Sequence, residues 1–205
     1  RVREHDAKGR SIPGSGATTT DPVPGDDLVL TLDRSLQFQV EQALLTTLHS
    51  VMNDQPLIDG YHHTDLRRTR SAMQSIIPVS TGLARGVERL LPQLAGRVHA
   101  KAIRVPTLNV SAIDLVLQTS RDVTTDELNG LLCAAADGPL HTLLACSHEP
   151  HASVDFNHDP HSAIVDAGQT STGSPRLANL MIWFDNEWGF ANRLVDVTHH
   201  WLQDA

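Results

Sequence analysis

The stretch Thr46–Gly82, TTLHSVMNDQPLIDGYHHTDLRRTRSAMQSIIPVSTG, is the part of the chain around which its fold and chemistry are organised. It contains His49 and, further on, an arginine cluster at Arg67, Arg68 and Arg70. It ends in a hydroxyl-bearing turn, Ser80-Thr81, where a helix is expected to begin. Imidazole, guanidinium and hydroxyl groups together suit a phosphorylated substrate with a carbonyl group. The alternative is structural, with a packed His49 and solvated ion pairs for the arginines.

Composition argues against two classes of function. Acidic residues outnumber basic ones, 24 to 16, for a net charge of −8, whereas a nucleic-acid-binding surface needs clustered lysine and arginine. No apolar run approaches the length that crosses a membrane. The first residues, RVREHDAKGR, lack the apolar core of a signal peptide. We therefore expect a cytoplasmic protein with no nucleic-acid or membrane partner.

The two cysteines are too few for a disulfide framework and fit a reducing compartment. Cys133 is expected in the middle of a helix, on or beside its apolar face, as a buried structural thiol. Cys146 precedes the sequence SHEPH and is expected to be an inert thiol.

The N-terminal quarter of the chain has little apolar patterning. Residues 1–25 are rich in Gly, Pro, Ser and Thr, so we expect them to be extended and partly disordered. A short strand is predicted at Leu28–Leu32. It is followed by a helix that begins near Leu36, behind a cap at Asp33 or Ser35. The apolar residues of this helix would be Phe38, Val40 and Leu44 or Leu45.

Hydrophobic spacing predicts the elements that follow. A helix is expected over Gly82–Leu91, where a proline ends it. Apolar residues alternate over Ile113–Leu117, which predicts a strand with one face on a core. The best-signalled helix is Asp126–Asp137, because Thr124 and Glu127 form a capping box ahead of it.

Two further elements are expected near the C-terminus. Leu180–Phe184 is an apolar run typical of a buried strand. Behind it, an apolar stripe predicts a closing helix and consists of Phe190, Leu194, Val197 and Trp201. Strands and helices mixed in this order indicate an α+β domain.

The front of the chain resembles actinobacterial penicillin-binding proteins. The resemblance rests on RVREHDAKGRSIPGSG and PVPGDDLVLTLDRSLQFQVEQALL and covers about residues 1–45. The S-x-x-K, S-x-N and K-T-G motifs of that family are absent from the chain. Acyl transfer to a serine is therefore not an expected function.

Six motifs follow in order: TTLHSVMNDQ, DLRRTRSAMQSIIP, STG, RVPTLNVSAIDL, SVDFNHDPHSAIVDAGQT and WFDNEWGFANRLVD. They resemble the C-terminal catalytic domain of phosphorylating glyceraldehyde-3-phosphate dehydrogenases, in particular the erythrose-4-phosphate dehydrogenase branch. The resemblance spans residues 46–198 and predicts a domain over residues 46–205. The expected fold is α+β, a mixed, largely antiparallel sheet with helices packed on one face, preceded by a mostly extended N-terminal segment.

The resemblance implies roles for five residues. His49 would activate a cysteine thiolate and act as acid and base during hydride transfer. Arg104 would bind the substrate phosphate, supported by Thr81 and Gly82. Asn186 would hold the carboxamide of the cofactor NAD. The structural alternatives are a strand-end ion pair for Arg104, a helix cap for Thr81 and a turn for Asn186.

The chain departs from the family pattern upstream of His49. The nucleophile motif S-C-T-T-N is absent, no cysteine precedes His49, and the glycine-rich nucleotide-binding half is not in this sequence. The NAD site is therefore incomplete. We interpret the chain as a chimera and as the catalytic-domain part of an NAD-dependent dehydrogenase of sugar-phosphate aldehydes, inactive by itself.

The alternative is a non-catalytic module for oligomerisation or phosphate binding. In the family that the sequence resembles, the loop Val51–Pro78 builds subunit contacts. The expected partners are thus a phosphorylated aldehyde substrate and either a second copy of the chain or an intact dehydrogenase subunit.

Two features bear on the substrate. Met52 and the sequence NHDPH at Asn157–His161 favour the erythrose-4-phosphate branch, whereas the turn Ser80-Thr81-Gly82 is of the triose type.

A histidine-rich segment has spacings that suit zinc or nickel, in His148-x2-His151 and His158-x2-His161. The alternative is a loop that enters a strand at Ser162. Because the resemblance already accounts for NHDPH, we expect no metal site.

Overall fold

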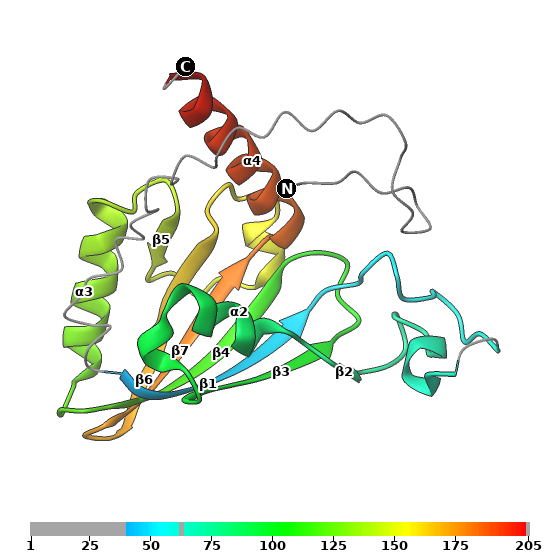
Figure 1. Ribbon diagram of the computed structural model, residues 1–205, viewed down its shortest axis with the longest axis horizontal. Coiled ribbons are helices and arrows are strands. Elements are labelled where there is room, and N and C mark those ends of the chain that lie inside the picture. Colours follow the sequence, from blue (N-terminus) through cyan, green and yellow to red (C-terminus); the bar gives the residue numbers. More distant parts are fainter. Residues whose placement is uncertain (1–39, 62–63, 204–205) are drawn as a thin grey trace, which may run out of the picture. The chain divides into compact units, whose positions relative to one another are not determined.

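The computed structural model describes residues 40–61 and 64–203. The strand predicted at Leu28–Leu32 lies outside the described residues. In the described part, seven strands form one sheet in the order β2-β3-β1-β4-β7-β6-β5 (Figure 1). The strands are β1 (Val40–His49), β2 (Ile77–Val79), β3 (Val98–Arg104), β4 (Ser111–Thr119), β5 (Leu144–Ser147), β6 (Ala163–Ser174) and β7 (Leu177–Phe184).

The sheet is mixed and largely antiparallel, as predicted. Strand β1 pairs with β3, and β5 with β6, in parallel, whereas the pairs β1–β4, β2–β3, β4–β7 and β6–β7 are antiparallel. The helices are α2 (Leu83–Leu90), α3 (Thr125–Asp137) and α4 (Asn186–Gln203), with short 3-10 helices η1 (Leu66–Thr69), η2 (Pro92–Leu94) and η3 (Ser153–Phe156). Helix α2 packs against β3, and α3 packs against β5 and β6. The α+β fold class is therefore confirmed.

Local signals predicted α2 and α3 well. Helix α3 begins where the capping box placed it, since the Thr124 hydroxyl accepts a hydrogen bond from the Glu127 backbone N–H at 3.2 Å. Helix α2 ends just before Pro92, which begins η2. The residues that start and end these helices lie within them or next to them, so the local sequence favours the same structure as the tertiary packing.

The helix predicted from Leu36 is wrong over its described part, because residues from Val40 to His49 form strand β1. The apolar residues of this segment happen to match a helical spacing as well as a strand. Strand β1 lies inside the sheet, between β3 and β4, and pairs with both. Pairing on both sides satisfies its backbone groups and overrides the local preference.

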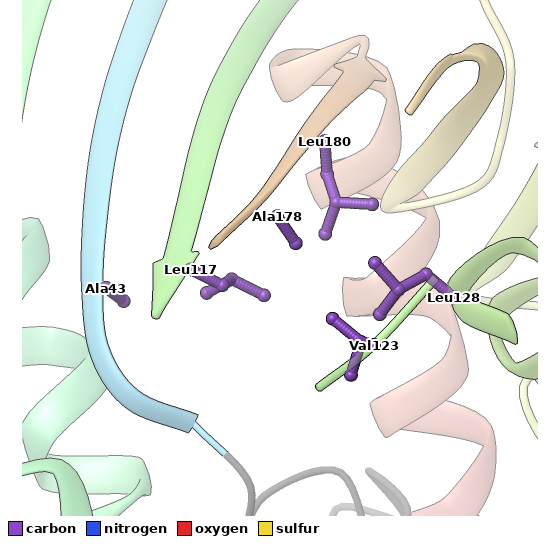
Figure 2. Packing of buried hydrophobic residues seen from close by; sticks show 6 residues of the cluster. All are labelled: Ala43, Leu117, Val123, Leu128, Ala178 and Leu180. Carbon is purple, nitrogen blue, oxygen red and sulfur yellow. The ribbon is translucent and has the colours of Figure 1, made fainter. Parts of the chain in front are cut away.

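The main core lies between the sheet and α3 (Figure 2). Its buried members are Ala43, Leu117, Val123, Leu128, Ala178 and Leu180. Along β1, Ala43 and Thr47 are buried, whereas Leu44 between them is 40% exposed. Successive strand residues point to opposite faces, so β1 has one covered and one open face. Strand β6 is covered on both faces, since its successive residues Ile164 and Val165 are both buried.

Helix α4 forms where the C-terminal helix was predicted, but its apolar stripe does not close a core. Phe190, Leu194, Val197 and Trp201 are 65%, 54%, 45% and 72% exposed. Figure 1 shows α4 running away from the end of β7. Arg193 ties it to the rest of the domain by donating to the Thr142 carbonyl and the Ser162 hydroxyl. Among the described helices, none is long and apolar enough to span a bilayer.

The expectation of two separate thiols is wrong, because Cys133 and Cys146 form a disulfide. Cys133 lies on α3 and Cys146 on the edge strand β5, against which α3 packs. This packing brings their Cα atoms to 5.2 Å, a separation that a disulfide spans readily. The bond follows from tertiary packing, which two cysteines in a sequence do not reveal.

Candidate functional site

His49 and Arg104 lie side by side at the C-terminal ends of two neighbouring strands inside the sheet. They end the parallel strands β1 and β3 and are register partners in that pair. His49 is half-buried, and its ring meets the edge of Phe184 at a centroid distance of 5.9 Å. Burial lowers the pKa of His49, and the positive charge of Arg104 lowers it further. The imidazole is therefore neutral at neutral pH and able to accept a proton.

Ser111 connects His49 to Asn186. The buried Ser111 hydroxyl lies 3.5 Å from His49 Nδ1, accepts from the Ser50 backbone N–H at 3.1 Å and donates to Asn186 Oδ1 at 3.4 Å. Val110, just before it, is buried with a φ of 63°. A β-branched residue rarely adopts this conformation, so the backbone is held in a strained turn that presents Ser111. Ser111 was not among the residues predicted for the site, although it lies in the motif RVPTLNVSAIDL.

Asn186, the first residue of α4, is positioned by its neighbour Asp185. The buried Asp185 carboxylate accepts hydrogen bonds from the backbone N–H groups of Trp188 and His158 and from the Asn109 amide. Burial by itself raises the pKa of Asp185, but these hydrogen bonds outweigh it and hold the pKa below its usual value. Asp185 thus caps α4 as a carboxylate. Asp185 was not among the predicted residues, although an aspartate just before a helix is a typical capping signal.

Arg104 is held by two acceptors of the loop after β1. Its guanidinium donates to Gln55 Oε1 at 2.6 Å and pairs with the Asp54 carboxylate at 2.9 Å. Its side chain is 14% exposed. The ion pair proposed as the structural alternative for Arg104 is therefore present. The guanidinium still borders open space, because Arg104 lines a cavity of about 640 Å³.

This cavity is basic and polar. Besides Arg104 it is lined by Arg67, Arg68 and Ser80, among others. Arg68 pairs with Asp65 at 3.8 Å, and both side chains are exposed. The cavity could hold a small anion, since guanidinium groups bind phosphate oxygens through fixed pairs of donors.

Thr81 and Gly82 do not line this cavity. The Thr81 hydroxyl accepts from the Leu83 backbone N–H at 3.1 Å, at the start of α2, and Gly82 is the residue before that helix. This contact at the start of α2 resembles the structural alternative for Thr81, while the N-cap position itself is Gly82. Of the turn Ser80-Thr81-Gly82, Ser80 is the residue that shares the cavity with Arg104.

In the part of the chain that the structure describes, the four histidines of this segment do not come together as their spacing suggested, although His148 lies beside Cys133 and Cys146. His151 lies 3.0 Å from the Ser147 hydroxyl and stacks edge-on against Phe156. His161 pairs with Asp159 at 2.6 Å. Among the described residues, the group close enough to hold a metal consists of Cys133, Cys146 and His148.

The fold and this site define an α+β domain in which a neutral imidazole lies beside a guanidinium that borders an open cavity. Residues 28–186 match the family model described as glyceraldehyde 3-phosphate dehydrogenase, C-terminal domain. The chain therefore belongs to this family. The match begins at residue 28, ahead of the boundary expected near residue 45.

Proposed function

We propose that this chain is the catalytic-domain part of an NAD-dependent, phosphorylating dehydrogenase of erythrose 4-phosphate or glyceraldehyde 3-phosphate. The observation that carries the proposal is the pairing of His49 with Arg104 at the ends of neighbouring strands. It combines a base of lowered pKa with a cation that lines an open cavity. An aldehyde that carries a phosphate needs a base at its carbonyl and a cation at its phosphate, and these neighbouring strand ends supply one of each.

The chain's own residues supply proton transfer and binding. His49, being neutral, takes the proton from an attacking thiol, returns it to the aldehyde oxygen as the thiol adds, and takes it again from the resulting hydroxyl as the hydride leaves. Ser111 orients the imidazole, and Arg104 binds the phosphate once the anion displaces Asp54. NAD would accept the hydride, and the Asn186 amide would hold its carboxamide. Because no cysteine precedes His49 here, the thiol comes from another polypeptide segment, and this chain alone is inactive.

Met52 supports erythrose 4-phosphate as the substrate. Its sulfur lies 3.9 Å from the Asn186 amide nitrogen, so the side chain at position 52 borders the site. This side chain is apolar here, whereas triose enzymes of the family typically carry a threonine at this position. The sequence NHDPH supports the same branch by its resemblance, and Asp185 holds this segment by accepting a hydrogen bond from the His158 backbone N–H.

The experiment separates phosphate binding from turnover. Inorganic phosphate is titrated into the chain by calorimetry, and Arg104→Met is expected to weaken binding by about tenfold or more because a charge-assisted contact is lost. Arg121→Gln, which removes a distant surface ion pair with Glu127, is the matched control. Equal binding by all three proteins would contradict the anion site.

Turnover is tested with a nucleotide-binding domain of the same family added as a separate chain. NADH formation from erythrose 4-phosphate is expected in the mixture, is absent with His49→Asn, and is absent for the chain alone. NADH formation by the chain alone would show that the nucleophile had been assigned to the wrong segment.

We also propose that residues 1–45 and 46–205 have separate origins, in line with the two resemblances, and that the protein works in the cytoplasm. Sequencing genomic DNA and transcript across codons 40–50 tests the join. A continuous natural reading frame supports a gene rearrangement.

A second candidate function is association with another copy of the chain or with a dehydrogenase subunit. The observation that favours it is apolar exposure in the loop after β1 and on α4. Leu57, Ile58 and Tyr61 are 65%, 77% and 94% exposed, and exposed apolar residues that lie close together in one loop suit a protein–protein contact. Light scattering is expected to show a dimer or larger species that Ile58→Lys shifts toward monomer. A monomer at all concentrations, alone and mixed with the intact enzyme, would count against it.

A further inference from the structure

A cluster of sulfur and nitrogen ligands lies far along the sheet from His49. Cys133, on α3, and Cys146, on the edge strand β5, are half-buried, and the exposed His148 follows in the loop after β5. The ligand atoms of all three lie within 4.8 Å of one another. The order β2-β3-β1-β4-β7-β6-β5 separates β5 from β1 by three strands, so this cluster is distinct from the site at Arg104.

We propose that Cys133, Cys146 and His148 bind a zinc ion when the disulfide is reduced. Two thiolates and one imidazole are ligands that zinc prefers, and three protein ligands leave a fourth position for water. This site does not depend on the dehydrogenase function proposed above.

The distances suit tetrahedral zinc. Zn–S bonds of about 2.3 Å and Zn–N bonds of about 2.1 Å at tetrahedral angles place a sulfur and a nitrogen about 3.6 Å apart. Cys133 Sγ and His148 Nε2 are 3.8 Å apart. The helix and strand that carry the cysteines pack directly together, so two of the three ligands are on rigid elements. The two cysteine side chains have to turn so that their sulfurs separate, and His148, on a loop, can adjust to them.

The zinc and disulfide states exclude each other. A disulfide holds its sulfurs in covalent contact, whereas two sulfurs on one tetrahedral zinc lie about 3.8 Å apart. A dithiol reductant transfers two electrons and two protons to the disulfide and becomes a disulfide itself. Zinc then displaces the two thiol protons and binds the thiolates together with neutral His148.

The test uses cobalt(II) and zinc(II) on the full chain, with and without prior reduction. Thiolate ligation of cobalt produces a near-ultraviolet charge-transfer absorption that histidine ligation does not. We expect one equivalent of cobalt to produce this band in the reduced chain only, and zinc to abolish it by displacement. The thiolate band distinguishes the site from the chain's other histidines.

Variants assign the ligands. His148→Ala, which leaves the disulfide intact, is expected to weaken zinc binding by about tenfold or more in the reduced chain. Cys133→Ser is expected to abolish the two-thiolate absorption, and circular dichroism reports whether the variant folds. His199→Ala, at an exposed position on α4, is the matched control and leaves affinity unchanged. Absence of the cobalt band in the reduced chain, or equal affinity for His148→Ala and the unaltered chain, would overturn the proposal.

Discussion

His49 owes its neutral state to two features of its surroundings, its partial burial and the nearby guanidinium of Arg104. Both disfavour the imidazolium in the folded chain, while the unfolded chain protonates near the ordinary value of about 6.5. The unfolded state therefore binds more protons as pH falls below that value, and stability declines toward acid pH. The burial and the positive charge that keep His49 neutral therefore also lower the stability of the fold at acid pH.

We predict that His49→Gln reduces this acid sensitivity. The urea midpoint of the unaltered chain is expected to fall between about pH 7.5 and about pH 5, and the fall is expected to be smaller in the variant because no imidazole has to be protonated. His99→Gln, at an exposed position on β3, serves as the control. An identical pH dependence for His49→Gln and the unaltered chain would contradict the account.

Asp185 is expected to stabilise the fold through its carboxylate. Asp185→Asn replaces an acceptor of three hydrogen bonds with an amide and is expected to cost about 1–3 kcal/mol in the free energy of unfolding. Because the folded pKa of Asp185 is lowered, this stabilisation is complete above the ordinary value of about 3.9 and is lost as pH falls through the folded pKa.

Urea unfolding at neutral and acid pH measures this prediction. The difference between Asp185→Asn and the unaltered chain is expected to narrow in acid. Asp122→Asn, which removes an exposed pair with Arg176, is the control and should change stability by less than about 0.5 kcal/mol. An equal effect of both substitutions would mean that the Asp185 hydrogen bonds add little.

At the scale of elements, α3 is the helix whose formation and packing can be tested most directly. Its cap lies in the local sequence, whereas its packing depends on Leu128, which is 2% exposed and belongs to the main core. Leu131, on the same helix, is 38% exposed. These two leucines form a matched pair.

We predict that Leu128→Ala lowers the free energy of unfolding by about 2–5 kcal/mol, because it leaves a cavity between α3 and the sheet. Leu131→Ala is expected to cost less than about 1 kcal/mol, since solvent already reaches it. Chemical denaturation of both variants measures the difference. Similar losses in the two variants would show that α3 does not pack as described.

Strand β1 illustrates what local patterns leave open. Its apolar residues suit a helical stripe as well as a strand, and no residue within it decides between them. The partners β3 and β4 decide, and they begin far along the chain at Val98 and Ser111. Helix α3 could be predicted because its cap and its apolar spacing lie within the helix and just before it.

At the scale of the whole molecule, the disulfide joins α3 to the edge strand across a sequence separation of 13. We predict that its reduction lowers the free energy of unfolding by about 3 kcal/mol, because the unfolded chain gains loop entropy. Urea unfolding with and without a reductant, in the presence of a chelator, measures the change apart from any zinc. The double variant Cys133→Ser, Cys146→Ser should not respond to reductant, and a response from it would point to another cause.

The sequence by itself determined the family of this protein and the α+β class, because these depend on residue types in short ordered motifs. It also determined α2 and α3, whose signals lie within a few residues. The roles of His49, Arg104 and Asn186 stay predictions. Only the tertiary structure decided that residues from Val40 form a strand, that Ser111 and Asp185 support the site, and that two cysteines meet beside His148. The physical reason is that strand pairing, buried hydrogen bonds and ligand clusters join residues that are far apart in the sequence. A local sequence pattern does not show which distant residues will meet.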